Sequence, residues 1–236
     1  MSADEASFVR EQYATPDNLR ARKSAYVNAE GDDPRQFAFE AVAAAQPRRV
    51  LEVGGGEGEL AARIETELGV EVVGIDQSEA MVAEQRAKGI DARVGDVQQL
   101  PFAEGEFDVA VAAWMLYHVP DLDRGLAELG RVLRAGGRLV AVTNAPDSLH
   151  ELWTLLGADR TPFLIAGFHS DNGAEILQRH FQHVDEREAS GTVTFADAEA
   201  VQRYVDSLVT VSGTVPQFEG ELICSRRSTI FVAEKQ

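Results

Sequence analysis

Residues 52 to 59 carry glycines at a spacing that suits the binding of a small ligand. Glycines at positions 54, 56 and 58 alternate with other residues, and Glu52 and Gly55 stand beside them. Glycine takes positive φ angles at no steric cost, and it lacks the Cβ atom that would hold a ligand away from the backbone. When a helix follows such a loop, its first N–H groups have no partner within the helix and face the same crevice. The spacing therefore predicts that something small binds at this loop.

A strand and a helix must flank this loop if it is to hold a ligand. The apolar run at residues 50 to 53 has the length of a strand, and apolar residues recur at helical spacing from position 60 to position 68. The loop alone leaves the ligand open, because Gly56-x-Gly58-x-x-Ala61 also satisfies the dinucleotide-binding fingerprint. A glycine-rich turn without a ligand is a further alternative, although three alternate glycines carry an entropy cost that a plain turn does not need.

An acidic residue follows the next predicted strand. This strand spans residues 70 to 75, with Asp76 at its end and Ser78 as the cap of a helix from 79 to 88. In nucleotide-binding α/β sheets an acidic residue at this place accepts hydrogen bonds from ribose hydroxyls. Asp76 therefore favours a ligand that carries a ribose. The alternative is a carboxylate that only stabilises the start of the helix.

The run after the third predicted strand narrows the choice of ligand. Residues 90 to 94 form this strand, and Gly95-Asp96-Val97, Leu100-Pro101-Phe102 and a fourth strand at 107 to 111 follow it. Together with the pattern Glu-x-Gly-x-Gly-x-Gly at positions 52 to 58, this run resembles the class I S-adenosylmethionine (SAM)-dependent methyltransferases. Within that family it is most similar to the small-molecule enzymes of methyltransferase type 11. The resemblance extends from about residue 47 to about residue 145.

The resemblance implies which residues of the core hold the cofactor. Asp96 would accept a hydrogen bond from the exocyclic amine of adenine, and the residue after it would flank the ring. A nicotinamide enzyme has no equivalent requirement at this position. The segment after the fourth strand would line the methionyl side of the site. The cofactor-binding residues implied in this way are Glu52, Gly54, Gly55, Gly56, Gly58, Asp76, Gln77, Met81, Asp96, Val97, Ala113 and Trp114.

Residues 9 to 27 are expected to form helical pieces over the edge of the sheet, with Pro16 near the start of one helix. In the related methyltransferases such a helix closes over the cofactor, with an aromatic residue and an arginine near the methionyl carboxylate. Tyr13 and Arg22 are the matching residue types, and a guanidinium suits a carboxylate through its two-pronged donor geometry. The alternative is a packed tyrosine beside solvated arginines.

The acceptor side offers two histidines as candidate general bases. A base is needed only if the acceptor is a protonated hydroxyl or ammonium, since the methyl group of SAM is already activated. His118 follows the fourth strand and is the first candidate, and His169 in an inserted segment is the second. An equal alternative is that His118 only caps or packs beside its neighbours. Residues 112 to 118 lack the Asn/Asp-Pro-Pro-Tyr/Phe sequence of enzymes that methylate amino groups of nucleic acids, which argues against such an acceptor.

The whole chain, residues 1 to 236, is expected to form a single class I methyltransferase domain. The resemblance implies an α/β fold with a Rossmann-like doubly wound sheet of seven strands, mostly parallel with an antiparallel last strand. Residues 1 to 46 would form a helical cover, and residues 47 to 145 the SAM-binding core. Segments 144 to 171 and 190 to 225 would be inserted lid segments on the acceptor side, where loops carry specificity.

The later elements are predicted from their apolar pattern. Residues 134 to 138 are interpreted as the glycine-rich end of a helix, ahead of a fifth strand at 139 to 143. The sixth and the last strand are expected at 181 to 188 and at 228 to 233.

Composition argues against several other classes of protein. The 39 acidic and 22 basic residues give a net charge of −17, whereas nucleic-acid binding depends on lysine and arginine at phosphates. No apolar run approaches the roughly 18 residues of a membrane span, so no membrane partner is expected. The single cysteine, Cys224, cannot form an internal disulfide and suits a reducing cytoplasm. The five histidines lack the spacing of a helical metal site, and no metal is expected.

The leading interpretation is a SAM-dependent methyltransferase that acts on an oxygen, nitrogen or carbon atom of a small molecule, with S-adenosylhomocysteine (SAH) as product. An NAD(P)-dependent oxidoreductase on a Rossmann sheet is the first alternative, and a SAM-binding module without catalysis is the second. A cytoplasmic monomer or homodimer is expected.

Overall fold

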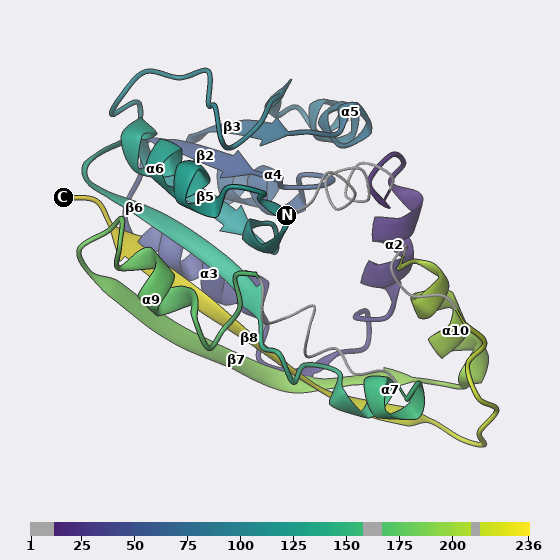
Figure 1. Ribbon diagram of the computed structural model, residues 1–236. Helices are drawn as coiled ribbons and strands as arrows, with labels where there is room; N and C mark the ends of the chain where they lie inside the picture. Colours follow the sequence, from purple (N-terminus) through teal and green to yellow (C-terminus); the bar gives the residue numbers. More distant parts are fainter. Residues whose placement is uncertain (1–11, 158–166, 209–212) are drawn as a thin grey trace.

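One continuous sheet crosses the computed structural model, which describes residues 12 to 157, 167 to 208 and 213 to 236 (Figure 1). The eight strands follow the spatial order β1-β7-β8-β6-β5-β2-β3-β4. The strands from β6 to β4 pair in parallel, whereas β8 pairs antiparallel with both of its neighbours. The strands are β1 (Glu30–Gly31), β2 (Arg49–Val53), β3 (Glu71–Asp76), β4 (Asp91–Val94), β5 (Phe107–Ala113), β6 (Leu133–Asn144), β7 (Val184–Phe195) and β8 (Leu222–Glu234).

The sheet has eight strands where the sequence predicts seven, because β1 adds to its outer edge. The two residues of β1 pair antiparallel with Thr192 and Gly191 of β7. So short a strand has no apolar alternation of its own, and it exists only through its partner. The expectation of a mostly parallel sheet with an antiparallel last strand is confirmed.

Helices cover both faces of the sheet. On one face α3 (Pro34–Ala44) and α4 (Glu59–Leu68) pack on a core rich in valine, and α5 (Glu79–Ala87) lies against β3 and β4. On the other face α6 (Leu122–Val132) and α9 (Gly173–Leu177) pack on a second core with several phenylalanines. Because side chains along a strand alternate between the faces, the neighbours Val50 and Leu51 are buried in different cores.

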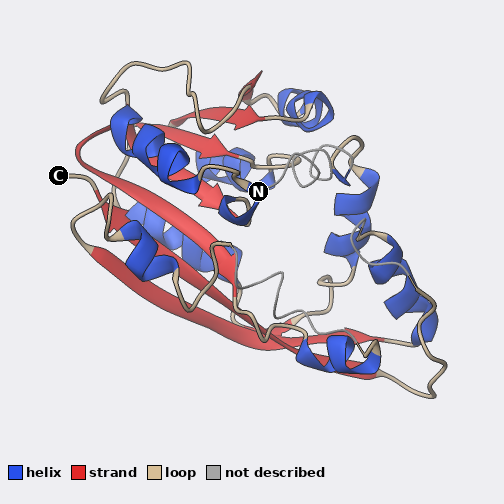
Figure 2. Cartoon of the chain, in the orientation of Figure 1, coloured by secondary structure: helices blue, strands red, loops and turns tan. Residues whose placement is uncertain are grey.

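The strands β7 and β8 continue past the end of β6 as a two-stranded ribbon (Figure 2). At its outer end α7 (His150–Leu155) and α10 (Ala198–Asp206) pack around a third apolar cluster, which includes Trp153 and Phe195. The helix α2 (Asp17–Ser24) lies beside α10 (Figure 1). Residues from the expected N-terminal cover and from both expected inserts therefore pack together in this third apolar cluster.

Three predicted boundaries are wrong. The strand β6 begins at Leu133, so the residues interpreted as a glycine-rich helix end belong to the strand, and the residue that ends α6 is extended. A Cβ at Gly137 would lie 3.0 Å from the carbonyl of Asp108, which explains a glycine there without a helix cap. The strands β7 and β8 extend past their predicted ends because their outer halves pair with each other beyond the end of β6.

Parts of the predicted cover and inserts, namely residues 1 to 11, 158 to 166 and 209 to 212, lie outside the described residues. Within the described ranges, no helix combines the length and the apolar character that crossing a membrane requires.

Candidate functional site

The glycine loop joins β2 to α4 at the carboxyl end of β2. Gly54, Gly56 and Gly58 have positive φ angles of 63°, 56° and 75°. The N–H of Gly54 donates to the carbonyl of Ile75 at 2.7 Å, which holds the start of the loop against β3. Gly58 is the N-cap of α4, and no side chain caps that helix end. The loop thus has a left-handed geometry that only glycine adopts readily, at the open start of a helix.

Asp76 ends β3 directly beside this loop. Its carboxylate accepts from the backbone N–H of Ser78 at 2.9 Å and from that of Gly56 at 3.3 Å. Burial raises the pKa of Asp76, and the backbone donors act in the opposite direction. The hydroxyl of Ser78 accepts from the N–H of Met81, as predicted for the cap of α5. The expected ribose acceptor therefore also ties the glycine loop to the start of α5.

Glu52 lies under the glycine loop and is only 1% exposed. Its Oε2 faces Gly55 and has no hydrogen-bond partner among the described residues. Burial raises the pKa of Glu52 to about 7, against the effect of a hydrogen bond from the N–H of Ala61. A carboxyl group with this pKa changes its charge near neutral pH, so it can respond to a cationic ligand.

Tyr13 and His118 are far apart in the sequence but form a hydrogen-bonded pair. Tyr13 Oη lies 3.1 Å from His118 Nε2, and the two rings are perpendicular. His118 ends the short helix η1 (Leu116–His118), which follows β5. Burial, with a contribution from Arg22, lowers the pKa of His118 to about 4, whereas burial raises the pKa of Tyr13. Both groups are therefore neutral at neutral pH, and the hydrogen bond can run in either direction.

Arg22 lies on α2 next to the same pair. Its guanidinium carbon is 5.3 Å from the centroid of the Tyr13 ring. One guanidinium nitrogen donates to the carbonyl of Ser207 at 2.8 Å, while the buried NH2 nitrogen has no partner among the described residues. The structure thus brings Tyr13, Arg22 and His118 together between the cover and the core. Arg22 offers an unpaired donor to an anionic group.

Asp96 follows β4, and its carboxylate already has a partner. The backbone N–H of Gln98 donates to Asp96 Oδ1 at 2.8 Å, and Nε2 of Gln98 lies 3.0 and 2.9 Å from the two carboxylate oxygens. Each carboxylate oxygen can accept a further bond, so an adenine amine could bind beside Gln98. Of the other predicted adenosine residues, Val97 and Met81 are buried in the core and Gln77 is exposed.

Trp114 follows Ala113 at the end of β5 with an unusual backbone conformation. Its φ angle is 54°, a value that costs a non-glycine residue about 1 to 2 kcal/mol and that is often found at functional sites. Its indole N–H donates to Asn144 Oδ1 at 3.0 Å. Asn144 also accepts from the hydroxyl of Ser228 at 2.9 Å. Sequence reasoning missed Asn144, whose only signal is its place at the end of the fifth parallel strand.

His169, the second candidate base, has its hydrogen bonds within its own turn. Its N–H donates to Asn172 Oδ1 at 2.8 Å, and its Nδ1 accepts from the N–H of Asp171 at 3.2 Å. Burial lowers the pKa of His169. The described residues show no hydrogen bond between His169 and the Tyr13–His118 pair, so only His118 belongs to the cluster around Arg22.

Glu57 is the second residue of the site that sequence reasoning missed. It is 6% exposed, and its carboxylate pairs with Arg20 at 2.7 Å and with Lys23 at 2.9 Å. Burial raises the pKa of Glu57, but the two cations outweigh burial and lower it overall. Because both cations lie on α2, Glu57 fastens the cover to the glycine loop. Its only signal in the sequence is an acidic residue between two glycines.

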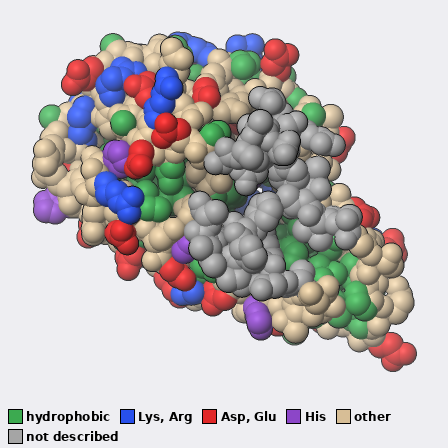
Figure 3. All heavy atoms as spheres, viewed as in Figure 1, with side chains coloured by type: hydrophobic (Ala, Val, Ile, Leu, Met, Phe, Trp, Pro, Cys, Tyr) green, Lys and Arg blue, Asp and Glu red, His purple; other side chains and the backbone are tan. Residues whose placement is uncertain are grey.

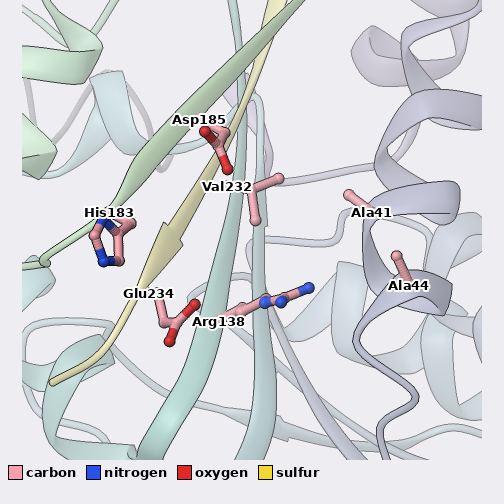
Figure 4. A pocket seen from close by; sticks show the side chains of 7 residues that line it. All are labelled: Ala41, Ala44, Arg138, His183, Asp185, Val232 and Glu234. Carbon is pink, nitrogen blue, oxygen red and sulfur yellow. The ribbon is translucent and has the colours of Figure 1, made fainter.

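A surface hollow at the opposite edge of the sheet does not belong to this site (Figure 4). Arg138 of β6, which lines it, pairs with Val109 near the start of β5, so the hollow lies at the amino ends of the parallel strands. Ligands of open α/β sheets bind at the carboxyl ends. We therefore place the candidate site at the glycine loop. The hollow is lined by Ala41, Ala44, Arg138, His183, Asp185, Val232 and Glu234.

Charged side chains of both signs are interspersed over the coloured part of the face in Figure 3. The described residues on this face show no basic stripe of the kind that binds nucleic acid.

Comparison with known proteins identifies the family. Residues 51 to 141 match the family described as a methyltransferase domain. A demethylmenaquinone methyltransferase of Beutenbergia cavernae is 39% identical over 108 residues, which are 45% of this chain and 45% of that protein. A malonyl-[acyl-carrier protein] O-methyltransferase of Chlorobium luteolum is 29% identical over 84% of this chain and 77% of that protein. The chain spans about half the length of most of the curated relatives it matches.

A solved structure shows that the fold is shared over almost the whole chain. Phosphoethanolamine N-methyltransferase 2 of Haemonchus contortus, in complex with phosphomonomethylethanolamine and SAH, superposes with a TM-score of 0.65 at 15% identity. The superposition covers 98% of this chain and 60% of that one. Together with the glycine loop, the matched domain shows that residues 51 to 141 are those of a class I SAM-dependent methyltransferase, whose cofactor is SAM, and the solved structure shows that the fold is shared.

Proposed function

We propose that the protein transfers a methyl group from SAM to an oxygen, nitrogen or carbon atom of a small molecule. The observation that carries this proposal is the left-handed glycine loop at the carboxyl end of β2, with Asp76 beside it. The match of residues 51 to 141 to a methyltransferase domain supports it.

The residues around the loop fit SAM. A Cβ at Gly54 would come within 2.8 Å of Met115, and a Cβ at Gly56 would come within 2.9 Å of Leu19, so neither position has room for a side chain. Two buried polar atoms without partners complement the charges of the cofactor. Glu52 Oε2 suits its cationic end, and the NH2 nitrogen of Arg22 suits its carboxylate.

When bound, SAM supplies a methyl group that its sulfonium has already activated for transfer. The protein must therefore orient the acceptor, exclude water and take up a proton where the acceptor carries one. The helix α2 with Arg22 and the segment with Tyr13 cover one side of the site, and η1 with His118 lies on the other. The inserts at 144 to 171 and 190 to 225 are the places where acceptor specificity would reside.

We assign proton uptake to His118. Tyr13 Oη is hydrogen-bonded to Nε2 of His118. A proton from a hydroxyl or ammonium acceptor can therefore reach Nε2 in two ways. Either Tyr13 passes its own proton to His118 and takes the proton of the acceptor, or the Tyr13 hydroxyl rotates away and the acceptor contacts Nε2 directly. Burial and Arg22 keep the pKa of His118 at about 4, so it is a weak base. A weak base suits a proton that becomes acidic as the methyl group is transferred, and it does not suit prior ionisation of the acceptor.

The proposed activity can be tested with SAM labelled in its methyl group. The purified protein is incubated with labelled SAM and fractions of a metabolite extract, and small molecules are separated and counted. Label in a small molecule that depends on the protein supports the proposal. Binding of SAM without transfer to any fraction would favour the module without catalysis. The names of two relatives, a demethylmenaquinone methyltransferase and a malonyl-[acyl-carrier protein] O-methyltransferase, suggest quinone precursors and free carboxylic acids as first acceptors to include.

Glu52 predicts a pH dependence of cofactor binding. Its pKa of about 7 lies above the ordinary value of 4.5 because of burial, so its carboxyl group is neutral below about pH 7. A cation bound beside it favours the carboxylate. The affinity for SAM should therefore rise as the pH increases through about 7, and Glu52→Gln should flatten this rise. Calorimetric titration with SAM on either side of that pH checks the expectation, and an equal slope in both proteins would contradict it.

The same carboxyl group predicts a change in stability with pH. In the unfolded chain Glu52 ionises near its ordinary value, whereas in the folded chain it keeps its proton up to about pH 7. The free energy of unfolding of the unliganded protein should fall as the pH rises from 4.5 to about 7, and the fall should be smaller in Glu52→Gln.

The ion pairs of Glu57 predict that the cover loosens when they are removed. Glu57→Gln takes away the carboxylate that holds Arg20 and Lys23 of α2. Hydrogen exchange of residues 13 to 27 should become faster in this variant, because contacts that favour the closed cover are lost. In the wild-type protein SAH should slow exchange in the same residues and in the loop from Gly54 to Gly58.

Glu67→Gln is the matched control for this prediction. Glu67 also pairs with an arginine, Arg63, but within α4 and exposed to solvent. Exchange at residues 13 to 27 should not change in the control. If Glu57→Gln and SAH both left this exchange unaltered, α2 would be a fixed edge of the fold and Tyr13 and Arg22 would not belong to a closing cover.

A further inference from the structure

Gln85 lies behind the glycine loop, outside the motif by which the loop is recognised. It belongs to α5 and is fully buried. Its Nε2 donates to the carbonyl of Gly56 at 2.8 Å. The N–H of the same glycine donates to Asp76. Both backbone polar groups of Gly56 are therefore held by side chains, one from the end of β3 and one from α5.

The side chain of Gln85 also fills space that two other glycines leave. A Cβ at Gly58 would come within 2.7 Å of Gln85 Cγ, and a Cβ at Gly74 of β3 would collide with Gln85 Oε1. The orientation of the amide follows from its partner, because the carbonyl of Gly56 requires a donor. The glycine at position 58 therefore makes room for Gln85.

The buried amide oxygen of Gln85 lowers the stability of the folded protein. Oε1 is buried and has no hydrogen-bond partner among the described residues. A buried amide oxygen without a partner lowers stability, and an apolar side chain of similar length would avoid that loss. The bond from Nε2 to the carbonyl of Gly56 is the one hydrogen bond that the described residues show for the side chain of Gln85.

We propose that Gln85 is a positioning residue for the cofactor. Its amide fixes the carbonyl of Gly56, and with it the left-handed conformation of the loop that receives SAM. It acts through Gly56 and sets the affinity for the cofactor rather than the rate of methyl transfer. This inference rests on the proposed function of the loop.

Gln85→Met tests the proposal, because methionine keeps the length of the side chain and removes the donor. The dissociation constant of SAH should increase about three- to tenfold, as expected for one lost hydrogen bond in the binding-competent loop. The KM for SAM should increase in parallel, while kcat at saturating SAM stays near the wild-type value. In the absence of any ligand, hydrogen exchange at residues 54 to 58 should become faster.

Val82→Ala is the control for a general loss of stability. Val82 lies on the same helix, is 1% exposed and packs in the apolar core. This variant should lower the melting temperature and leave both SAH affinity and exchange of the loop unchanged. Unchanged affinity and loop exchange in Gln85→Met would overturn the proposal, and so would equal changes in the two variants. If the wild-type protein did not bind SAH, the proposed function would fail, while the exchange experiment would still decide whether Gln85 holds the loop.

Discussion

Replacing Gly56 by valine should abolish the binding of SAM and SAH while the protein stays folded. The φ angle of Gly56 is 56°, which is costly for a β-branched residue. A Cβ there would also lie 2.9 Å from Leu19 of α2, so a side chain would push the cover away from the loop. We expect affinity to fall by about two orders of magnitude or more, since backbone strain and the displaced cover act together. Calorimetric titration with SAH, with circular dichroism as a check of folding, measures this.

Gly69→Val separates strain from displacement of the cover. Gly69 ends α4 with a φ angle of 66°, almost the same as that of Gly56, and a Cβ there would meet no atom within 4 Å. This control should lose stability and keep the wild-type affinity for SAH. Wild-type affinity in Gly56→Val would show that the cofactor does not occupy the glycine loop.

Replacing Asp76 by alanine should weaken SAM binding by about 1 to 3 kcal/mol, the range for polar groups left without a partner. We propose that Asp76 accepts from the ribose hydroxyls, and it also accepts from the N–H groups of Gly56 and Ser78. The loss should therefore combine a missing ligand contact with a looser loop. Asp96→Ala should cost less, because a single bond to a neutral amine is involved and Gln98 already shares that carboxylate.

Asp123→Ala is the control for the removal of a carboxylate. Asp123 is exposed on α6 and pairs with His180, away from the residues of the site. Titration with SAM should show the largest loss of affinity in Asp76→Ala, a smaller loss in Asp96→Ala and the smallest in Asp123→Ala. Unchanged affinity in both Asp76→Ala and Asp96→Ala would mean that the adenosine moiety binds elsewhere.

The central fold could be predicted because its signals are local. The run from β2 through α4 to β3 follows from apolar periodicity and glycines within about thirty residues, and these elements lie close to their predicted ranges. β1 could not be predicted, since two residues carry no pattern. The outer halves of β7 and β8 were missed for a related reason. Ser190 and Arg227, for example, are polar and lie opposite each other in the ribbon, so strand pairing there depends on a partner that is distant in the sequence.

The site shows the same division between local and distant signals. The glycines, Asp76 and Asp96 were predicted from short motifs, and the structure places them at or just after the ends of β2, β3 and β4. The bond from Tyr13 to His118 joins residues 105 positions apart, and no spacing in the sequence encodes it. Glu57 and Gln85 were missed because their roles depend on how α2 and α5 pack on the loop. Such contacts follow from tertiary packing, which the residue pattern of a single segment does not contain.

The most direct measurement for the proposed function is calorimetric titration of the full chain with SAH and, in a parallel experiment, with NAD. The glycine loop, Asp76 and Asp96 predict that SAH binds at a single site and competes with SAM. The match of residues 51 to 141 to a methyltransferase domain predicts that NAD does not bind. Binding of NAD without binding of SAH would contradict the account and favour the oxidoreductase.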